Sequence, residues 1–248
     1  MTNKDFIIGD VLGFGWRVMK GNIGFFAVLI LIAITISVVP EILRALAHVS
    51  PFSSPVVIMF GFILHVVSQV VNFVIAIGFV KVALSFCDQV KPTVATLFDV
   101  WDCFWRYVGV SILYGLIVFA GMLLLIIPGI IWAVKFQYGF YFVVDKGLGP
   151  VAALKASSRT TQGIKFKLFG FGLLCGLINL LGLICLIVGM FATYPMVLVA
   201  MALVYRHLIV QIPELAEFGV IITSPEPQPQ DEQIDQARHE PEQSEPNE

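Results

Sequence analysis

Long apolar runs separated by short polar segments fill the chain between Asn22 and Leu208. A helix needs about 20 apolar residues to cross roughly 30 Å of hydrocarbon. Runs of about that length cover residues 22–43, 56–80, 107–127, 130–145, 168–188 and 190–208. The fourth run is the shortest, so its helix must tilt little, thin the bilayer or face a water-filled recess. The pattern predicts an all-α polytopic bundle with six transmembrane spans.

Turn residues between the runs group the predicted spans into three hairpins. Pro128 and Gly129 separate the third run from the fourth, and Gly189 and Met190 separate the fifth from the sixth. Both are tight turns that leave almost no loop. The first hairpin has a longer loop, which runs from about residue 44 to residue 55.

Basic residues gather at one end of the predicted spans. The residues at this end are Lys4, Arg17, Lys20, Lys81, Lys91, Arg106, Lys146, Lys155, Arg159, Lys165, Lys167 and Arg206. Only Arg44 falls in a connection at the other end. Because Lys and Arg are retained on the cytoplasmic side, we expect a multi-pass protein of the bacterial cytoplasmic membrane with both termini in the cytoplasm. The first run lacks a small-residue cleavage site, so we expect it to be retained as a span.

The polar segment before each hairpin has helical periodicity. Apolar residues recur on one face from residue 7 to 20 and from residue 93 to 106, and a third segment runs from Pro150 to Gly163. Such segments are typical of interfacial helices that lie flat at headgroup depth. The chain then repeats one unit, a connector helix followed by a hairpin, three times. The alternative, that any multi-span protein with amphipathic connectors shows this pattern, stays open.

Composition divides the 248 residues into four parts: a cytoplasmic amphipathic helix (1–21), a six-span membrane domain (22–210), a juxtamembrane segment (211–222) and an acidic tail (223–248). The tail has almost no apolar residues, so it cannot bury enough surface to fold. The chain is 58% hydrophobic and 13% charged, whereas soluble domains are about 25% charged. Its basic residues are spread over several connections, which argues against nucleic-acid binding.

A polar stripe follows the second span. His65, Ser68, Gln69 and Asn72 stand at positions i, i+3, i+4 and i+7, which places them on one helix face. Exposing these side chains to lipid would be costly. They either form hydrogen bonds with other helices or line a polar path or ligand site.

Small residues on the fifth span predict close helix packing. Gly172 and Gly176 form a G-x-x-x-G pattern, and Asn179 falls on the same face. We expect Asn179 to bond across this contact, and we hypothesise that it faces the stripe of the second span. Pro195 is expected to kink the sixth span, which frees carbonyl groups that neighbouring helices must satisfy.

Lys135 lies well inside the fourth span, and the sequence shows no acid at a comparable depth. An unpaired ammonium group in hydrocarbon is costly, so Lys135 must extend to the interface, meet water or bind an anion. A lipid phosphate or an anionic substrate would satisfy the last alternative. Lys135, the stripe and Asn179 are therefore the candidate lipid, anion or substrate contacts.

The sequence contains no recognisable catalytic or metal-binding motif. There is no H-E-x-x-H, P-loop or G-x-S-x-G pattern. Cys87, Cys103, Cys175 and Cys185 form no C-x-x-C pair, so we expect no disulfide, metal or cofactor.

One stretch is similar to a known pattern. It comprises residues 127–135, then Asp145, residues 153–157, Gly163 and Lys167. The stretch resembles a broad group of bacterial six-span membrane proteins of unknown function, which includes the membrane domain fused to some glycerophosphodiester phosphodiesterases. The resemblance implies a helical bundle in the bacterial cytoplasmic membrane. It implies no phosphodiesterase activity, because these residues include no soluble catalytic domain from which a catalytic residue could be transferred.

These observations favour a non-enzymatic membrane protein that contacts or organises lipids, other membrane proteins or further copies of itself. The alternative is a small transporter or permease component with a polar path lined by His65, Gln69 and Asn72. A membrane-embedded enzyme acting on lipid would need an acid or nucleophile within reach of His65.

Overall fold

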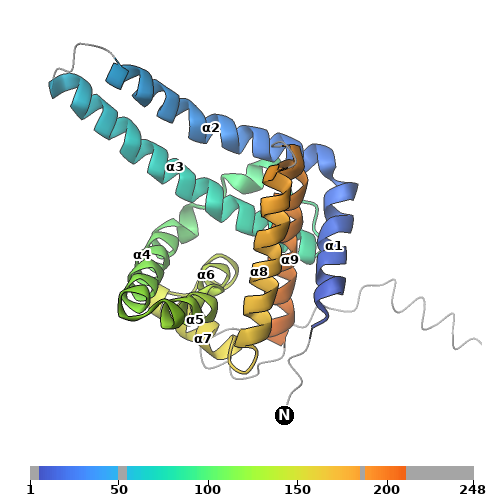
Figure 1. The fold of residues 1–248 in the computed structure, drawn as a ribbon. Coiled ribbons are helices and arrows are strands. Elements are labelled where there is room, and N and C mark those ends of the chain that lie inside the picture. Colours follow the sequence, from blue (N-terminus) through green and yellow to red (C-terminus); the bar gives the residue numbers. More distant parts are fainter. Residues whose placement is uncertain (1–5, 50–54, 185–187, 211–248) are drawn as a thin grey trace, which may run out of the picture.

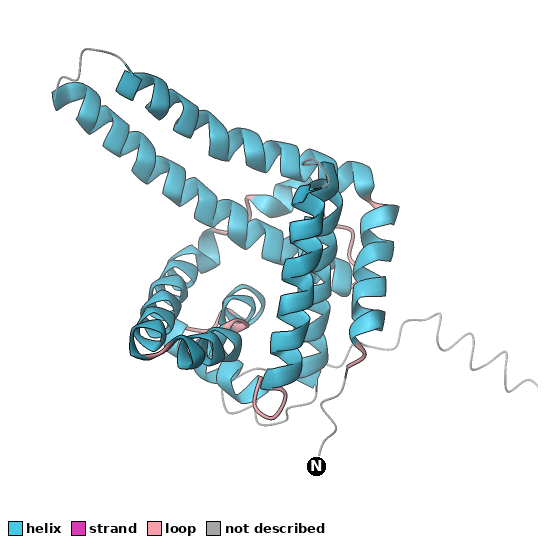
Figure 2. Cartoon of the chain, viewed as in Figure 1, coloured by secondary structure: helices cyan, strands magenta, loops and turns pink. Residues whose placement is uncertain are grey.

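The computed structural model describes residues 6–49, 55–184 and 188–210, and these parts of the chain contain helices and no strand (Figures 1 and 2). The helices are α1 (Ile8–Gly21), α2 (Ile23–Val49), α3 (Pro55–Cys87), the 3-10 helix η1 (Val94–Leu97), α4 (Trp101–Leu124), α5 (Ile126–Phe136), α6 (Gly139–Lys146), α7 (Pro150–Thr160), α8 (Lys165–Ile184) and α9 (Val188–Val210). The predicted juxtamembrane segment, the predicted tail and Cys185 lie outside the described residues.

Six helical segments are long and apolar enough to cross a membrane. They are Ile23–Ile42, Met59–Cys87, Trp101–Leu124, Ile126–Lys146, Lys165–Ile184 and Phe191–Val210. The predicted all-α architecture with six spans is confirmed, and the chain is a multi-pass membrane protein. Large apolar side chains cover much of its outer surface, as expected for helices that have hydrocarbon as their solvent.

The hairpin of α2 and α3 diverges from the other helices, as Figure 1 shows. The two helices have 27 and 33 residues, which gives lengths of about 40 and 50 Å at 1.5 Å per residue. Both exceed the thickness of the hydrocarbon core. This hairpin therefore must tilt in the membrane or extend beyond it.

The turn between the third and fourth spans lies at Leu125, which has an extended backbone. The predicted turn residues Pro128 and Gly129 instead belong to the first turn of α5. Proline is tolerated there because the first N–H groups of a helix have no partner within it. Gly129 lies where α5 crosses α4: a Cβ on Gly129 would come 2.9 Å from the backbone nitrogen of Met122.

The fourth span is broken in the middle. After α5 ends at Phe136, the chain passes through Gln137 and Tyr138 before α6 begins at Gly139. In Figure 1, α5 and α6 appear as separate helices. The shortness of the apolar run in the sequence corresponds to two half-helices in the structure.

The connectors differ from flat interfacial helices. Helix α1 packs along α9, with Val11, Gly15 and Met19 buried in the contact, and the two helices run side by side in Figure 1. The connector predicted at residues 93–106 consists of the short η1 followed by the first turns of α4. Helix α7 begins at Pro150 as predicted. The face that carries most of its small side chains is, however, buried against α4, α5 and α6.

Each of the later two connectors packs on the hairpin that precedes it in the chain. The first connector has no hairpin before it and packs on the last hairpin. Helix α1 contacts α9, η1 contacts α3, and α7 contacts α4 and the broken fourth span. This arrangement agrees with a unit repeated three times. The largest group of buried apolar residues lies where α3, α4, α6, α7 and α9 converge.

Candidate functional site

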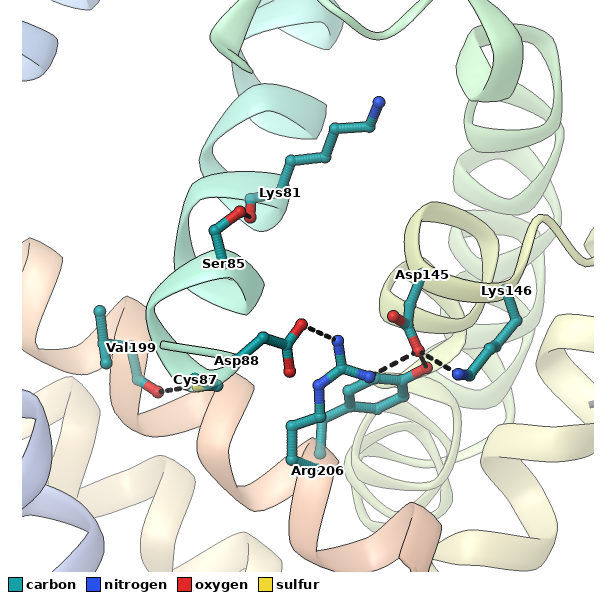
Figure 3. Close-up of polar contacts among 9 residues, drawn as sticks. Lys81, Ser85, Cys87, Asp88, Asp145, Lys146, Val199 and Arg206 are labelled. Carbon is teal, nitrogen blue, oxygen red and sulfur yellow. Dashed lines mark hydrogen bonds and ion pairs between the residues drawn. The ribbon is translucent and has the colours of Figure 1, made fainter. Parts of the chain in front are cut away.

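Charged side chains tie three spans together where the hairpins converge. Arg206 near the end of α9 donates from Nη2 to Asp88 Oδ2 at 2.6 Å and from Nη1 to Asp145 Oδ2 at 2.9 Å. Asp88 follows the last residue of α3, and Asp145 lies in the last turn of α6. Figure 3 shows the guanidinium group between the two carboxylates. We call these three residues the Arg206 cluster.

Two neighbours complete the environment of Asp145. The Tyr205 hydroxyl donates to Asp145 Oδ2 at 3.0 Å, and Lys146 Nζ lies 3.4 Å from the same oxygen. The Asp145 side chain is only 10% exposed. A buried carboxylate needs such partners because burial removes its hydration. With two carboxylates and two cations, the group is balanced in charge and suits a structural link better than a binding site for a charged ligand.

The break in the fourth span is stabilised by hydroxyl groups of α7 and of its C-cap residue, Thr161. The Ser157 hydroxyl donates to the Lys135 carbonyl oxygen at 2.9 Å, and the Thr161 hydroxyl lies 3.1 Å from the same oxygen. The last carbonyls of a helix have no partner within it, and an unpaired carbonyl is costly where water is excluded. Helix α7 therefore supplies the hydrogen bonds that the interrupted span requires.

The Lys135 side chain stands at the same break. Its Nζ lies 5.1 Å from the centre of the Phe136 ring. In the parts of the chain that the structure describes, no carboxylate pairs with this ammonium group. Two further polar atoms near it in the sequence, Gln137 Nε2 and the Tyr138 hydroxyl oxygen, are buried without a described hydrogen-bond partner. An anion site at Lys135 stays a prediction.

The stripe of the second span divides between two environments. Ser68 and Asn72 face α2: the Ser37 hydroxyl donates to Asn72 Oδ1 at 2.8 Å, and Asn72 Nδ2 donates to the Ser68 carbonyl at 2.9 Å. Gln69 is exposed on the outside of the hairpin. His65 also faces α2, and its Nδ1 lies 3.6 Å from Glu41 Oε1. An acid does therefore lie within reach of the stripe.

The small residues of α8 do not mark its contact with α9. A Cβ on Gly172 or Gly176 would meet open space. The close approach is at Gly182, where a Cβ would come within 2.4 Å of the Thr193 hydroxyl oxygen. Asn179 Oδ1 is buried without a described partner, and α8 packs mainly on α9 and α5 rather than on α3. Pro195 lies inside α9, and a kink at this position stays a prediction.

An apolar cavity opens between the first hairpin and α9. It has a volume of about 270 Å³ and walls that are almost entirely apolar. Its lining residues are Ile30, Ala33, Ile34, Ser37, Val38, Phe79, Phe191 and Tyr194. All of them belong to the candidate spans, so the cavity lies between helices that are long and apolar enough to cross a membrane. We call it the α2–α9 cavity.

Sequence reasoning missed the Arg206 cluster, Glu41 and this cavity. A signal for the cluster was present: Asp88, Asp145 and Arg206 each stand near the end of the second span of a hairpin, at near-equal spacing along the chain. No comparable signal marks the cavity, because its lining residues are ordinary apolar residues of membrane helices.

The comparisons with known proteins assign no family to this chain. No protein family matches the chain, and searches of curated proteins and of solved structures find no similar chain. What stands is a multi-pass membrane protein with six candidate spans.

Proposed function

We propose that this chain is a non-enzymatic protein of the bacterial cytoplasmic membrane that binds a membrane lipid, with the hydrocarbon chain of the lipid in the α2–α9 cavity. The observation that carries the proposal is the cavity itself, an apolar space lined by residues of three candidate spans. Binding pockets are mostly apolar and concave, and at this depth lipid chains are the ligand in contact with the opening.

The size of the cavity favours a single chain over a whole lipid. Pockets for drug-sized ligands have volumes of about 300–1,000 Å³, and this cavity is at the lower end with about 270 Å³. Dispersion contacts with Phe79, Phe191 and the α2 side chains would hold a chain without any charged group. The headgroup would then lie outside the cavity, in contact with the membrane surface.

The arrangement supports the transporter alternative less well. A polar path along the second span needs His65, Gln69 and Asn72 around one opening. Asn72 is hydrogen-bonded within the hairpin, and Gln69 is on the outside. The resemblance of the 127–167 stretch to bacterial six-span proteins agrees with the location we propose and adds no activity.

Photolabelling in vesicles tests the proposal. The full chain is reconstituted in phospholipid vesicles that contain a phospholipid with a diazirine in the middle of one acyl chain, and labelled peptides are mapped by mass spectrometry. We expect label to concentrate on residues 30–38 and 191–194. Ala33→Trp fills the cavity and should reduce this label several-fold.

Leu31→Trp is the matched control, because Leu31 lies on α2 outside the cavity lining and is exposed. This variant should keep the wild-type labelling pattern. Label spread evenly over the exposed surface, or label that is unchanged in Ala33→Trp, would contradict lipid binding in the cavity.

A further inference from the structure

The lining of the α2–α9 cavity contains two side chains with a hydroxyl group, Ser37 on α2 and Tyr194 on α9. The Ser37 hydroxyl donates its hydrogen to Asn72 Oδ1 at 2.8 Å. A hydroxyl group has one hydrogen to donate, so Ser37 has none left for a ligand. A hydrogen bond donated by a lining side chain to a molecule in the cavity must therefore come from Tyr194.

The Tyr194 hydroxyl is available for such a bond. The hydroxyl groups of Tyr114 and Tyr205 donate to the Ala133 carbonyl oxygen and to Asp145. Among the residues that the structure describes, the Tyr194 hydroxyl has no partner of this kind. The Tyr194 side chain is 36% exposed, so a ligand can reach it without moving a helix. A tyrosine hydroxyl in apolar surroundings usually finds a hydrogen-bond partner.

The ring of Tyr194 is already held in place. It packs edge-to-face on the ring of Phe79, with ring centroids 5.5 Å apart and an angle of 83° between the ring planes. Both residues line the cavity. A side chain that is ordered before binding loses little conformational entropy when a ligand arrives. Tyr194 therefore presents a hydroxyl group on a fixed ring.

Tyr194 lies near one end of the sixth span. It follows Phe191, the first residue of this candidate span, by three residues, or about 5 Å at 1.5 Å per residue. Tyrosine is enriched near the ends of membrane spans because its ring is apolar and its hydroxyl is polar. The ester groups of membrane lipids lie at the same level, between the hydrocarbon and the headgroups.

The lining favours a neutral acceptor over a charged one. None of the residues that line the cavity carries a charge. A phosphate or a free carboxylate placed there would lose its hydration without gaining a counter-charge, which is costly. The carbonyl group of an ester is neutral, needs a single donor and is joined directly to the acyl chain.

We propose that Tyr194 determines specificity by donating a hydrogen bond to the ester carbonyl of the lipid whose chain occupies the α2–α9 cavity, an inference that rests on the proposed function. The cavity then selects an ester-linked acyl chain over an ether-linked alkyl chain. An ether has a CH₂ group in place of the carbonyl, so it leaves the Tyr194 hydroxyl without an acceptor and binds more weakly.

Two photolabile phospholipids that differ in one linkage test this inference. The full chain is reconstituted in vesicles of ether-linked phospholipid with a small fraction of probe. The probe carries a diazirine in the middle of one chain, and this chain is joined to glycerol by either an ester or an ether. Wild-type labelling of residues 30–38 and 191–194 is expected to be about two- to tenfold stronger with the ester probe, the range for one neutral hydrogen bond.

Tyr194→Phe keeps the ring and removes the hydroxyl. This variant should be labelled equally by both probes, at the wild-type level of the ether probe, which also shows that its cavity is folded. Tyr114→Phe is the matched control, because the Tyr114 hydroxyl bonds to Ala133 and Tyr114 is outside the cavity lining. It should keep the wild-type preference for the ester probe.

The outcomes separate the two proposals. Absence of cavity labelling with both probes would overturn lipid binding and the selection with it. Equal labelling of the wild type by the two probes, or a preference that persists in Tyr194→Phe, would overturn the selection alone. A loss of labelling in Tyr194→Phe that is as large for the ether probe as for the ester probe would also overturn it, because Tyr194 would then act through packing.

Discussion

The guanidinium group of Arg206 donates to the Asp145 carboxylate at 2.9 Å, which joins the end of α9 to the end of α6. The same group donates to Asp88 at 2.6 Å, so the last turns of three hairpins meet at one side chain. Arginine suits this role because its planar group presents several donors in fixed directions. The helices of the three hairpins can then diverge, as Figure 1 shows, while these ends stay together.

Arg206→Ala should lower the free energy of unfolding by about 2 kcal/mol, because it leaves two carboxylates without their shared partner. Loss of an exposed ion pair costs at most about 1 kcal/mol, and loss of one partner of a buried pair about 3–5 kcal/mol. The cluster is partly buried, so we expect an intermediate value. Thermal unfolding in detergent measures it, with Arg17→Ala on the exposed face of α1 as the control. Equal unfolding temperatures for the two variants would show that the cluster does not hold the spans.

Gly15→Ala should destabilise the contact between α1 and α9. A Cβ at this position would come 2.4 Å from the Met196 carbonyl oxygen and 3.4 Å from Ala200 Cβ, so α1 must move away. Overpacking of this kind costs about 1–3 kcal/mol.

Gly13→Ala is the matched control, because a Cβ on Gly13 meets nothing within 4 Å. It should stabilise the helix by about 0.5–1 kcal/mol. Thermal unfolding and protease sensitivity near residue 22 distinguish the two variants. If Gly15→Ala behaves like Gly13→Ala, α1 does not pack on α9 as described.

The double variant Ser157→Ala/Thr161→Val should destabilise the broken fourth span by about 1–3 kcal/mol, because the partly buried Lys135 carbonyl loses both hydroxyl partners. Ser157→Ala alone should cost less, since Thr161 can still donate. Hydrogen exchange at residues 136–142 in lipid nanodiscs measures the local effect. Ser158→Ala is the neighbouring control, and faster exchange in this control would argue against specific stabilisation by α7.

Cysteine labelling tests the predicted orientation. Single cysteines at Lys91 and Lys155 should resist a membrane-impermeant maleimide in intact cells and react after the membrane is opened. This result follows from retention of basic connections in the cytoplasm. Labelling of either position in intact cells would reverse the orientation, while the six spans themselves would stand.

The number and approximate limits of the spans could be predicted from the sequence, because about 20 consecutive apolar residues have few alternatives to a membrane helix. The residues at which the spans end could be predicted less accurately. Helix α3 continues seven residues beyond the predicted residue 80, because Lys81 is stabilised by Asp99 and does not end the span.

The break at Gln137 and Tyr138 could not be predicted, because neither residue ends a helix by its own preference. It depends on hydroxyl groups of α7 that are about 20 residues away in the sequence. The Arg206 cluster and the Glu41–His65 pair depend in the same way on helix packing between distant segments. The polar stripe was predicted on one face, yet Gln69 falls outside the contact because that face is wider than the hairpin interface.

The cavity between α2 and α9 is central to this account, and a high-resolution electron cryomicroscopy map of the full chain in lipid nanodiscs tests it most directly. We predict an elongated, unbranched density between Ala33 and Phe191 that is absent from a map of Ala33→Trp. Closure of α2 onto α9 with side chains filling the space, or an empty cavity in a map that resolves its walls, would contradict lipid binding there.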